Sequence, residues 1–323
     1  MSAHTAGSQD ARITLADGTT LPALGLGTWR AARGEVGAAV TTALELGYRH
    51  IDAAAVYGNE AEVGAALGAA FSRGLVQRQQ VWITSKLWND SHAPALVRPA
   101  LERTLQDLGL DHLDLYLIHW PVVHRPGVVM PSTAADQIPL EACPLADTWG
   151  AMEELVQAGL CRQIGVSNVS ATKLEALAAG ARLTPAMNQV ERHPYLQQGE
   201  LLACCRRLGV AVTAFAPLGS SGPNRPPELL SDPVITAIAN THGTSPAQVL
   251  LAWGLACGTA VIPKSVRADR LAANLAATQL QLSAADKTAI DGLERGQRLI
   301  DGHFWELPGG PYTRANLWDE PLG

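Results

Sequence analysis

The sequence predicts a single α/β domain over residues 1–323, a (β/α)8 TIM barrel with an N-terminal β-hairpin, two extra helices and a C-terminal loop over the active site. From Leu24 onward, short apolar runs alternate with helical stretches of roughly ten or more residues, a rhythm typical of a parallel sheet. The spacing is even and no G-x-G-x-x-G motif follows the first strand. A closed barrel is therefore favoured over a doubly wound sheet.

Eight apolar runs have the density expected of strands buried on both faces, near 24–27, 48–52, 81–86, 113–119, 161–166, 185–190, 210–215 and 259–263. Stretches with apolar residues recurring at three and four predict helices near 35–46, 60–72, 94–108, 145–158, 171–180, 198–208, 245–257 and 268–278. Two further helices are expected near 232–242 and 283–293, the second with Ser283 as N-cap. Asp17-Gly18 between two short runs in 12–23 predicts the hairpin.

The composition excludes several classes of protein. With 47% apolar and 17% charged residues the chain can fill a large core. The net charge of -6 is spread without long like-sign runs, so neither nucleic acid nor a membrane is an expected partner. The five cysteines lack C-x-x-C spacing, which argues against a disulfide framework or a thiolate metal site. No signal peptide or membrane span is apparent, so we expect a cytoplasmic protein. We also expect a monomer that acts on a small molecule and holds no metal.

Polar residues stand at or just after the ends of three predicted strands: Asp52 and Tyr57 after the second, Lys86 after the third and His119 after the fourth. Taken singly, each has an ordinary explanation, namely a buried ion pair, a loop aromatic or a core imidazole. Jointly they make chemical sense, because strand ends converge at one face of a barrel. A lysine beside a tyrosine lowers the pKa of the phenol, and a carboxylate holds the lysine in place. We therefore expect Tyr57 to be a proton donor near neutral pH.

The segments around these residues resemble the aldo-keto reductase superfamily. They are GYRHID (47–52), VYGNE (56–60), TSKLW (84–88), LDLYLIHWP (113–121) and IPKS (262–265), and the match runs in order from about Leu21 to Leu282. The resemblance implies a catalytic tetrad of Asp52, Tyr57, Lys86 and His119. It also implies reduction of aldehydes or ketones to alcohols by hydride transfer from NADPH, with Tyr57 as the general acid.

The sequence holds no glycine-rich phosphate loop, so a nicotinamide cofactor needs another kind of site. Lys264, Arg267 and Arg270, with the hydroxyl of Ser265, lie near a predicted helix N-terminus and could hold a doubly charged phosphate. The alternative is a solvated charged face. Arg270 and Asn274 are four residues apart and share one side of that helix.

The resemblance implies specific cofactor contacts. Lys264, Ser265 and Arg270 would take the 2′-phosphate of NADPH and Asn274 the adenine, while Ser167, Asn168 and Gln189 would hold the nicotinamide carboxamide. The remaining contacts would come from Thr28, Trp29, Asp52, Phe215, Leu218, Ser220, Val266 and Arg267. Phe215 stands where the family usually has a stacking tyrosine, Arg267 where it has a small polar residue, and Ala273 where many members have a glutamate. Turn chemistry is the plainer explanation of Ser167, Asn168 and Gln189.

Aromatic residues predict the substrate pocket. Its expected lining is Trp29, Tyr57, Trp88, His119, Trp120, Phe304 and Trp305, suited to a carbonyl on an apolar, aromatic or sugar carrier. The tryptophans could instead be core or lid packing. The segment from Arg295 to Gly323 has no clean helical period, and we expect a lid and not a structural layer.

Two other functions fit the same barrel. An isomerase or aldolase could use a lysine at a strand end, but a Schiff-base lysine has no use for this carboxylate and tyrosine. The second alternative is a nucleotide-binding regulatory subunit with little turnover. An intact tetrad argues against it.

Overall fold

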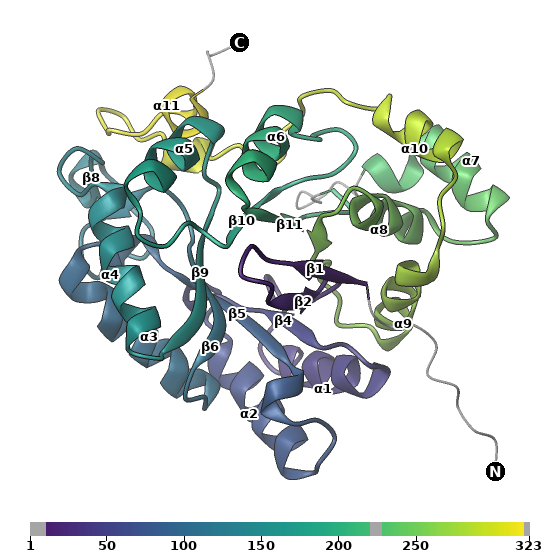
Figure 1. The fold of residues 1–323 in the computed structure, drawn as a ribbon, viewed down its shortest axis with the longest axis horizontal. Helices are drawn as coiled ribbons and strands as arrows, with labels where there is room; N and C mark the ends of the chain where they lie inside the picture. The colour runs from purple at the N-terminus through teal and green to yellow at the C-terminus, as the bar shows by residue number, and fades with distance from the viewer. Residues whose placement is uncertain (1–10, 220–227, 320–323) are drawn as a thin grey trace.

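The computed structural model describes residues 11–219 and 228–319 and shows a barrel of eight parallel strands (Figure 1). In the sheet the order is β12-β11-β10-β9-β6-β5-β4-β3. The strands are β3 (Leu26–Gly27), β4 (His50–Asp52), β5 (Trp82–Leu87), β6 (Leu113–Ile118), β9 (Cys161–Ser167), β10 (Met187–Glu191), β11 (Ala211–Phe215) and β12 (Ala260–Val261). Each overlaps a predicted apolar run, so the expected fold class is confirmed.

The first and last strands meet and close the sheet. Parallel bridges join Leu24 to Val261 and Gly27 to Lys264. The amide of Gly27 donates to the carbonyl of Pro263 at 3.2 Å. A Cβ at Gly27 would lie 2.8 Å from the carbonyl oxygen of Ile262, so only glycine lets the two backbones come this close.

Helices surround the strands, and Figure 1 shows them as an outer ring. They are α1 (Val36–Leu46), α2 (Glu60–Ser72), α3 (Pro94–Leu108), α4 (Leu145–Gln157), α5 (Ala171–Gly180), α6 (Gly199–Leu208), α8 (Pro246–Ala256) and α9 (Ala268–Ala276). The two extra helices are α7 (Pro233–Thr241) and α10 (Ala284–Asp291), and Ser283 caps α10 by accepting from the amide of Asp286. Within the described ranges, no helix has the length and apolar character needed to cross a membrane.

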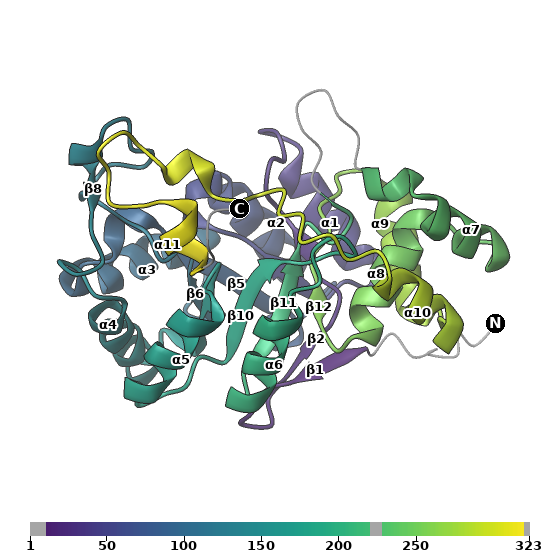
Figure 2. The ribbon, with the colours of Figure 1, turned by 90° about the horizontal axis from the view of Figure 1, so that it is seen from above.

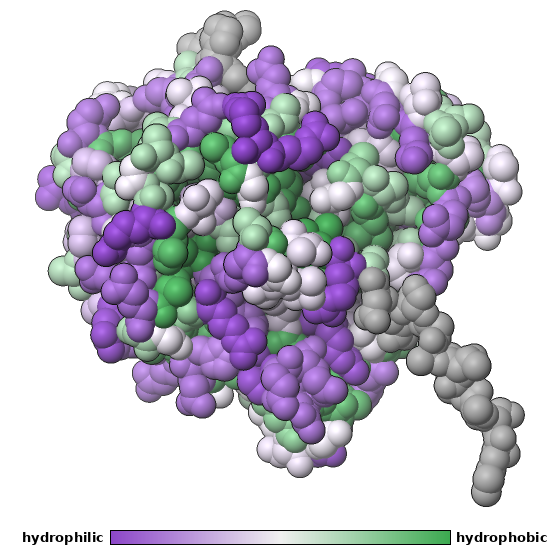
Figure 3. All heavy atoms as spheres, viewed as in Figure 1, coloured by the Kyte–Doolittle hydropathy of each residue, from purple (hydrophilic) through white to green (hydrophobic). Residues whose placement is uncertain are grey.

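The hairpin of β1 (Arg12–Thr14) and β2 (Thr20–Pro22) covers the amino-terminal end of the barrel. Gly18 takes a φ of 86°, as the Asp-Gly turn predicts. Leu15 and Leu21 are buried against side chains of the barrel strands, namely Trp82, Leu115, Leu117 and Met187. Figure 3 shows this face as hydrophilic surface interrupted by small hydrophobic patches. The hairpin therefore plugs this end of the barrel.

Two features were not predicted. The loop after β6 contains an antiparallel ribbon of β7 (Val123–His124) and β8 (Gln137–Ile138), and the C-terminal segment contains α11 (Arg314–Trp318). A strand of two residues is too short to show alternation, and a helix of five residues is too short to show a helical period. The C-terminal segment thus contains a short helix that its sequence does not indicate.

Replacing Gly27 with alanine should destabilise the barrel by about 1–3 kcal/mol, because the added methyl group meets backbone that cannot turn away. Urea unfolding measures the difference. The control is Gly68→Ala on α2, where a Cβ meets no atom within 4 Å and helix propensity should add up to about 1 kcal/mol. Equal effects of the two substitutions would contradict the role of Gly27 in closure.

Candidate active site

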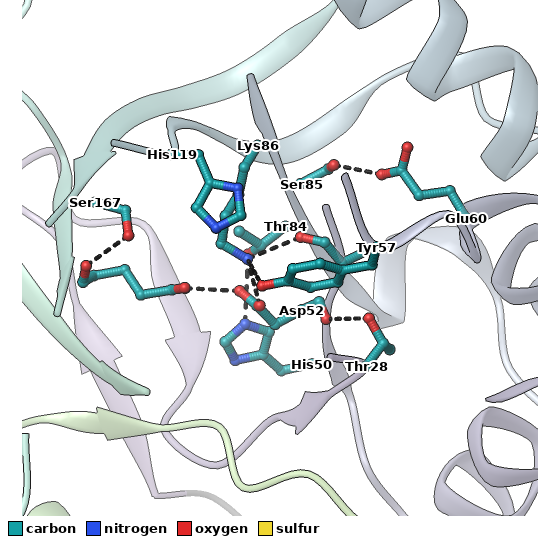
Figure 4. Close-up of polar contacts among 12 residues, drawn as sticks. Thr28, His50, Asp52, Tyr57, Glu60, Thr84, Ser85, Lys86, His119 and Ser167 are labelled. Atoms are coloured by element: carbon teal, nitrogen blue, oxygen red, sulfur yellow. Dashed lines mark hydrogen bonds and ion pairs between the residues drawn. The ribbon is translucent and has the colours of Figure 1, made fainter. Parts of the chain in front are cut away.

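The four predicted catalytic residues converge at the mouth of the barrel, the face where the carboxyl ends of the strands meet (Figure 4). Asp52 ends β4, Lys86 lies on β5, His119 follows β6, and Tyr57 ends the short 3-10 helix η1 (Ala55–Tyr57). The Lys86 ammonium donates to Asp52 Oδ1 at 2.6 Å and to the Tyr57 hydroxyl at 3.4 Å. Asp52 and Tyr57 precede Lys86 by 34 and 29 positions, and the ammonium group of Lys86 joins them.

Lys86 is a buried charge with a full set of acceptors. Burial opposes its charge, but Asp52 and Tyr57 outweigh burial and raise the pKa of Lys86 above its ordinary value. The third acceptor is the carbonyl of Ala53 at 2.9 Å. The second oxygen of Asp52 accepts from Gln189 Nε2 at 2.7 Å. Lys86 therefore stays protonated at neutral pH.

The pKa of Tyr57 differs from the prediction. Removal of the hydroxyl from water raises the pKa of Tyr57, and the attraction of Lys86, which lowers it, does not compensate. Asp52 adds a further increase. The expected lowering of this pKa was wrong because burial outweighs the ammonium. Tyr57 is thus a protonated phenol at neutral pH, able to donate to a stronger base such as a developing alkoxide.

His119 is a neutral imidazole. Burial first, then the charge of Lys86 and the neighbouring His92, hold the pKa of His119 well below its ordinary value. Its ring lies edge-on to Tyr57, with centroids 5.8 Å apart, and 5.0 Å from Trp88. A neutral ring carries one N–H, so His119 can donate a hydrogen bond to a carbonyl oxygen but is no acid.

Polar groups at and just after the end of β9, and on β10, form a layer next to Asp52. Ser167 donates to the carbonyl of Gln189 at 2.7 Å, and Asn168 Nδ2 donates to the carbonyl of His119 at 3.0 Å. Asn168 Oδ1 is buried and has no hydrogen-bond partner within residues 11–219 and 228–319. An unmatched buried acceptor is suited to the N–H of a carboxamide.

Strained backbone marks the same mouth. Three residues other than glycine take a positive φ shortly after strand ends: Arg30 at 56°, Asn168 at 60° and Ala216 at 46°. Such conformations cost free energy and cluster at functional sites. These conformations could not be predicted from the sequence, because only Asn168 among the three is a residue type that favours a positive φ.

The residues predicted to hold the 2′-phosphate follow β12 and differ in exposure. Lys264 and Arg270 are exposed, whereas Ser265 and Asn274 are buried. Arg267 forms two hydrogen bonds to Asp269, at 2.6 and 3.0 Å, and both side chains are exposed. The contact of Arg267 with the phosphate of the cofactor stays a prediction, and without the cofactor its guanidinium pairs with Asp269.

The other predicted cofactor residues lie at the mouth or just beyond it. Thr28 is buried and donates to the carbonyl of Asp52 at 2.9 Å. Phe215 and Leu218, at and after the end of β11, are half-buried, as is Val266. Ser220 lies outside the described residues.

The aromatic residues divide into a buried wall and an exposed rim. Trp305 is 1% exposed and packs on Trp88 and Trp120, with ring centroids 5.9 and 5.8 Å apart. Trp29 and Phe304 remain 47% and 36% exposed, and Trp29 lies 4.8 Å from Tyr57. The C-terminal segment completes an apolar cluster made of Trp88, Trp120, Val122, Trp305, Tyr312, Leu317 and Trp318. It is therefore part of the packed structure as well as a cover.

Glu60 holds the segment that carries Tyr57, a role not predicted from sequence. This glutamate begins α2, is 3% exposed, and accepts from Ser85 Oγ at 2.5 Å (Figure 4). It also accepts from Thr104 Oγ1 at 3.1 Å. Burial raises the pKa of Glu60 to about 7, although both hydroxyl groups lower it. Ser85 adjoins Lys86, so Glu60 ties the Tyr57 segment to the strand of Lys86.

Comparison with known proteins agrees with this geometry. A profile of the Aldo/keto reductase family matches residues 23–295. An aldo/keto reductase from Synechocystis sp. is 52% identical over 314 residues, which cover 95% of each protein. Aldo-keto reductase family 1 member A1 from Sus scrofa is 44% identical over 295 residues, 89% of this chain and 90% of that protein.

Solved structures show the same fold. Aldose reductase from Schistosoma japonicum superposes with a TM-score of 0.85 at 39% identity, covering 91% of this chain and 95% of that one. A Bombyx mori aldo-keto reductase in complex with NADP has a TM-score of 0.83 at 39% identity, covering 93% and 98%. The chain therefore belongs to the aldo/keto reductase family, whose members are generally NADP-dependent oxidoreductases acting on small carbonyl compounds.

Replacing Glu60 with glutamine should flatten part of the pH dependence of stability. The folded pKa of about 7 exceeds the ordinary value of 4.5, so the folded state binds more protons between these values and stability falls as pH rises through them. The loss is complete above about pH 7 and amounts to about 3 kcal/mol. Urea unfolding measures the free energy of unfolding at pH 5 and pH 8. The value for the variant, relative to that for the parent, should be higher at pH 8 than at pH 5. The exposed Glu102→Gln is the control, and an equal difference at both pH values would contradict the burial argument.

Proposed function

We propose that this protein reduces aldehydes or ketones to alcohols with NADPH, and that Tyr57 donates the proton. The carrying observation is the contact of the buried, protonated Lys86 with both Asp52 and the Tyr57 hydroxyl. An ammonium beside a phenol stabilises the phenolate that proton donation leaves behind. NADP(H) chemistry is that of the family.

The residues have separable roles in this reaction. NADPH, when bound, supplies the hydride that adds to the carbonyl carbon. The carbonyl π electrons move to oxygen, which takes the proton of the Tyr57 hydroxyl, so the alcohol O–H forms as the phenol O–H breaks. Lys86 stabilises the phenolate, and Asp52 keeps Lys86 in place. The neutral His119 orients the carbonyl oxygen with its N–H.

The cofactor fits the polar residues of the mouth. Asn168, with its unpartnered Oδ1, would hold the carboxamide together with Ser167 and Gln189. The half-buried Phe215 would stack on the nicotinamide, since stacking needs only an aromatic face. Lys264, Ser265 and Arg270 would take the 2′-phosphate and Asn274 the adenine. The remaining predicted contacts are Thr28, Trp29, Asp52, Leu218, Ser220, Val266 and Arg267.

The substrate would meet the exposed rim first. Trp29 and Phe304 are accessible, whereas Trp88, Trp120 and Trp305 are buried and support the wall. An apolar or aromatic aldehyde suits this lining, and sugars remain within the proposal. The cytoplasmic location, the monomeric state and the single domain over residues 1–323 belong to the same proposal.

Replacing Tyr57 with phenylalanine should lower turnover by about two to four orders of magnitude, because the proton donor is lost. NADPH affinity should stay nearly unchanged. Oxidation of NADPH at 340 nm with a panel of aldehydes measures turnover, and fluorescence titration measures affinity. Tyr48→Phe is the matched control, since that buried hydroxyl bonds only the carbonyl of Leu271 among the described residues.

If the turnover of Tyr57→Phe stayed within tenfold of that of the parent, the assignment of Tyr57 as the proton donor would be contradicted. A parent that binds NADPH tightly yet turns over none of the aldehydes would instead favour the regulatory subunit.

Replacing Lys264 and Arg270 together with alanine should nearly erase any preference for NADPH over NADH. Each charge-assisted contact to the phosphate contributes roughly 1.5–3 kcal/mol. Dissociation constants for both cofactors measure the preference. Arg98→Ala is the control and should leave it unchanged, because Arg98 lies on α3 and pairs with Glu102. An undiminished preference in the double variant would place the 2′-phosphate elsewhere.

A further inference from the structure

The C-terminal tail, defined as residues 295–319, is held by a buried carboxyl group as well as by aromatic packing. It runs from α10 past α6 to α11, as Figures 1 and 2 show from two directions. Where it begins, the amide of Gln297 donates to the carbonyl of Tyr195 at 2.9 Å. The next residues reach Glu191, the last residue of β10.

Among the described residues, the Glu191 carboxyl group has three polar neighbours, two backbone amides and one imidazole nitrogen. Oε1 accepts from the amide of Leu299 at 3.0 Å and lies 2.9 Å from Nε2 of His193. Oε2 accepts from the amide of Ile300 at 2.8 Å. The side chains of Glu191 and His193 are both 0% exposed. A buried carboxyl group is stable only when its oxygens are occupied in this way.

The donors in the tail are backbone amides of successive residues. The contact therefore positions the main chain, whatever side chains stand at 299 and 300. Phe304 and Trp305 follow four or five residues later, where Trp305 packs on Trp88 and Phe304 stays exposed. A shift of the tail at Ile300 would therefore move the exposed ring of Phe304.

The same strand also reaches the candidate catalytic residues. Gln189 stands two positions before Glu191 on β10, so the two side chains lie on the same side of the strand. Gln189 donates to Asp52 at 2.7 Å, and Glu191 accepts from the tail. One strand thus contacts both the group that holds Lys86 and the segment that covers the mouth.

We infer that Glu191 is a positioning residue that sets the tail over the mouth and so determines which substrates are accepted by size. The inference rests on the proposed function, because it concerns the substrate of that site. Glu191 touches neither Tyr57 nor Lys86 through any hydrogen bond and acts through the tail. Small carbonyl compounds that do not reach Phe304 are unaffected by its loss.

Glu191→Gln tests this with little change of shape. An amide offers one oxygen in place of two, and its NH2 group faces a backbone N–H in either orientation. One of the amides of Leu299 and Ile300 then loses its acceptor. The tail should detach locally while the barrel stays folded.

The matched control is Glu153→Gln. Glu153 is 3% exposed on α4, and its Oε1 accepts from the amides of both Arg182 and Leu183 at 2.7 and 2.8 Å, while its Oε2 accepts from Arg182 Nε at 2.6 Å. It is thus another buried carboxyl group that holds two successive backbone amides, and these partners lie outside the tail. Loss of a buried carboxylate affects both variants, but only Glu191→Gln takes the acceptor from an amide of the tail.

Kinetics with NADPH and two aldehydes, propanal and 2-naphthaldehyde, give the first measurement. In Glu191→Gln the KM for 2-naphthaldehyde should rise about tenfold, with kcat/KM for propanal within about twofold of the parent. Glu153→Gln should leave the ratio of the two KM values unchanged. An equal loss for both aldehydes in Glu191→Gln would overturn the inference.

Limited trypsin digestion gives a second measurement that needs no activity. Cleavage after Arg295, Arg298 or Arg314 should be several-fold faster in Glu191→Gln than in the parent and unchanged in Glu153→Gln. Unchanged cleavage in Glu191→Gln overturns the anchor. If the parent reduces neither aldehyde, the proposed function fails, and the digestion still decides whether Glu191 holds the tail.

Discussion

The buried ammonium of Lys86 is the constraint on which the rest of the site depends. Taking such a charge out of water costs several kcal/mol, and the fold offsets this with acceptors from Asp52, Ala53 and Tyr57. These come from β4 and the segment after it, while Lys86 lies on β5. The parallel register of β4 and β5, with Asp52 beside Thr84, brings them together. Closure of the barrel, which depends on Gly27, keeps that register.

Burial acts in opposite ways on the neighbouring groups and so divides their roles. It holds Tyr57 as a protonated phenol and His119 as a neutral imidazole, since the charged form of each is the one that loses water. Of the three, Lys86 keeps its charge, because it has the carboxylate of Asp52 in contact. The result is one protonated phenol, one neutral imidazole and one cation at the mouth of the barrel.

The tail adds a second, separable part to this layer. Its aromatic residues complete the wall beside Trp88 and Trp120, and two of its backbone amides donate to Glu191. Because β10 also carries Gln189 to Asp52, the cover and the candidate catalytic residues share a rigid element of the scaffold. In this arrangement the strands carry the candidate catalytic groups, and the tail adds aromatic residues to the wall of the mouth.

The sequence by itself determined the fold class. The apolar run of each strand and the helical spacing of apolar residues in each long helix lie within one short stretch of chain. The bounds of the helices at 60–72, 94–108 and 171–180 were predicted to the residue. Asp52, Lys86 and His119 were identified as candidates by their place at the ends of predicted strands. Only the tertiary structure decided the pKa direction of Tyr57, the pairing of Arg267 with Asp269, and the hydrogen bonds of Glu60 and Glu191. These depend on burial and on distances between side chains, and neither is a property of a local stretch of chain.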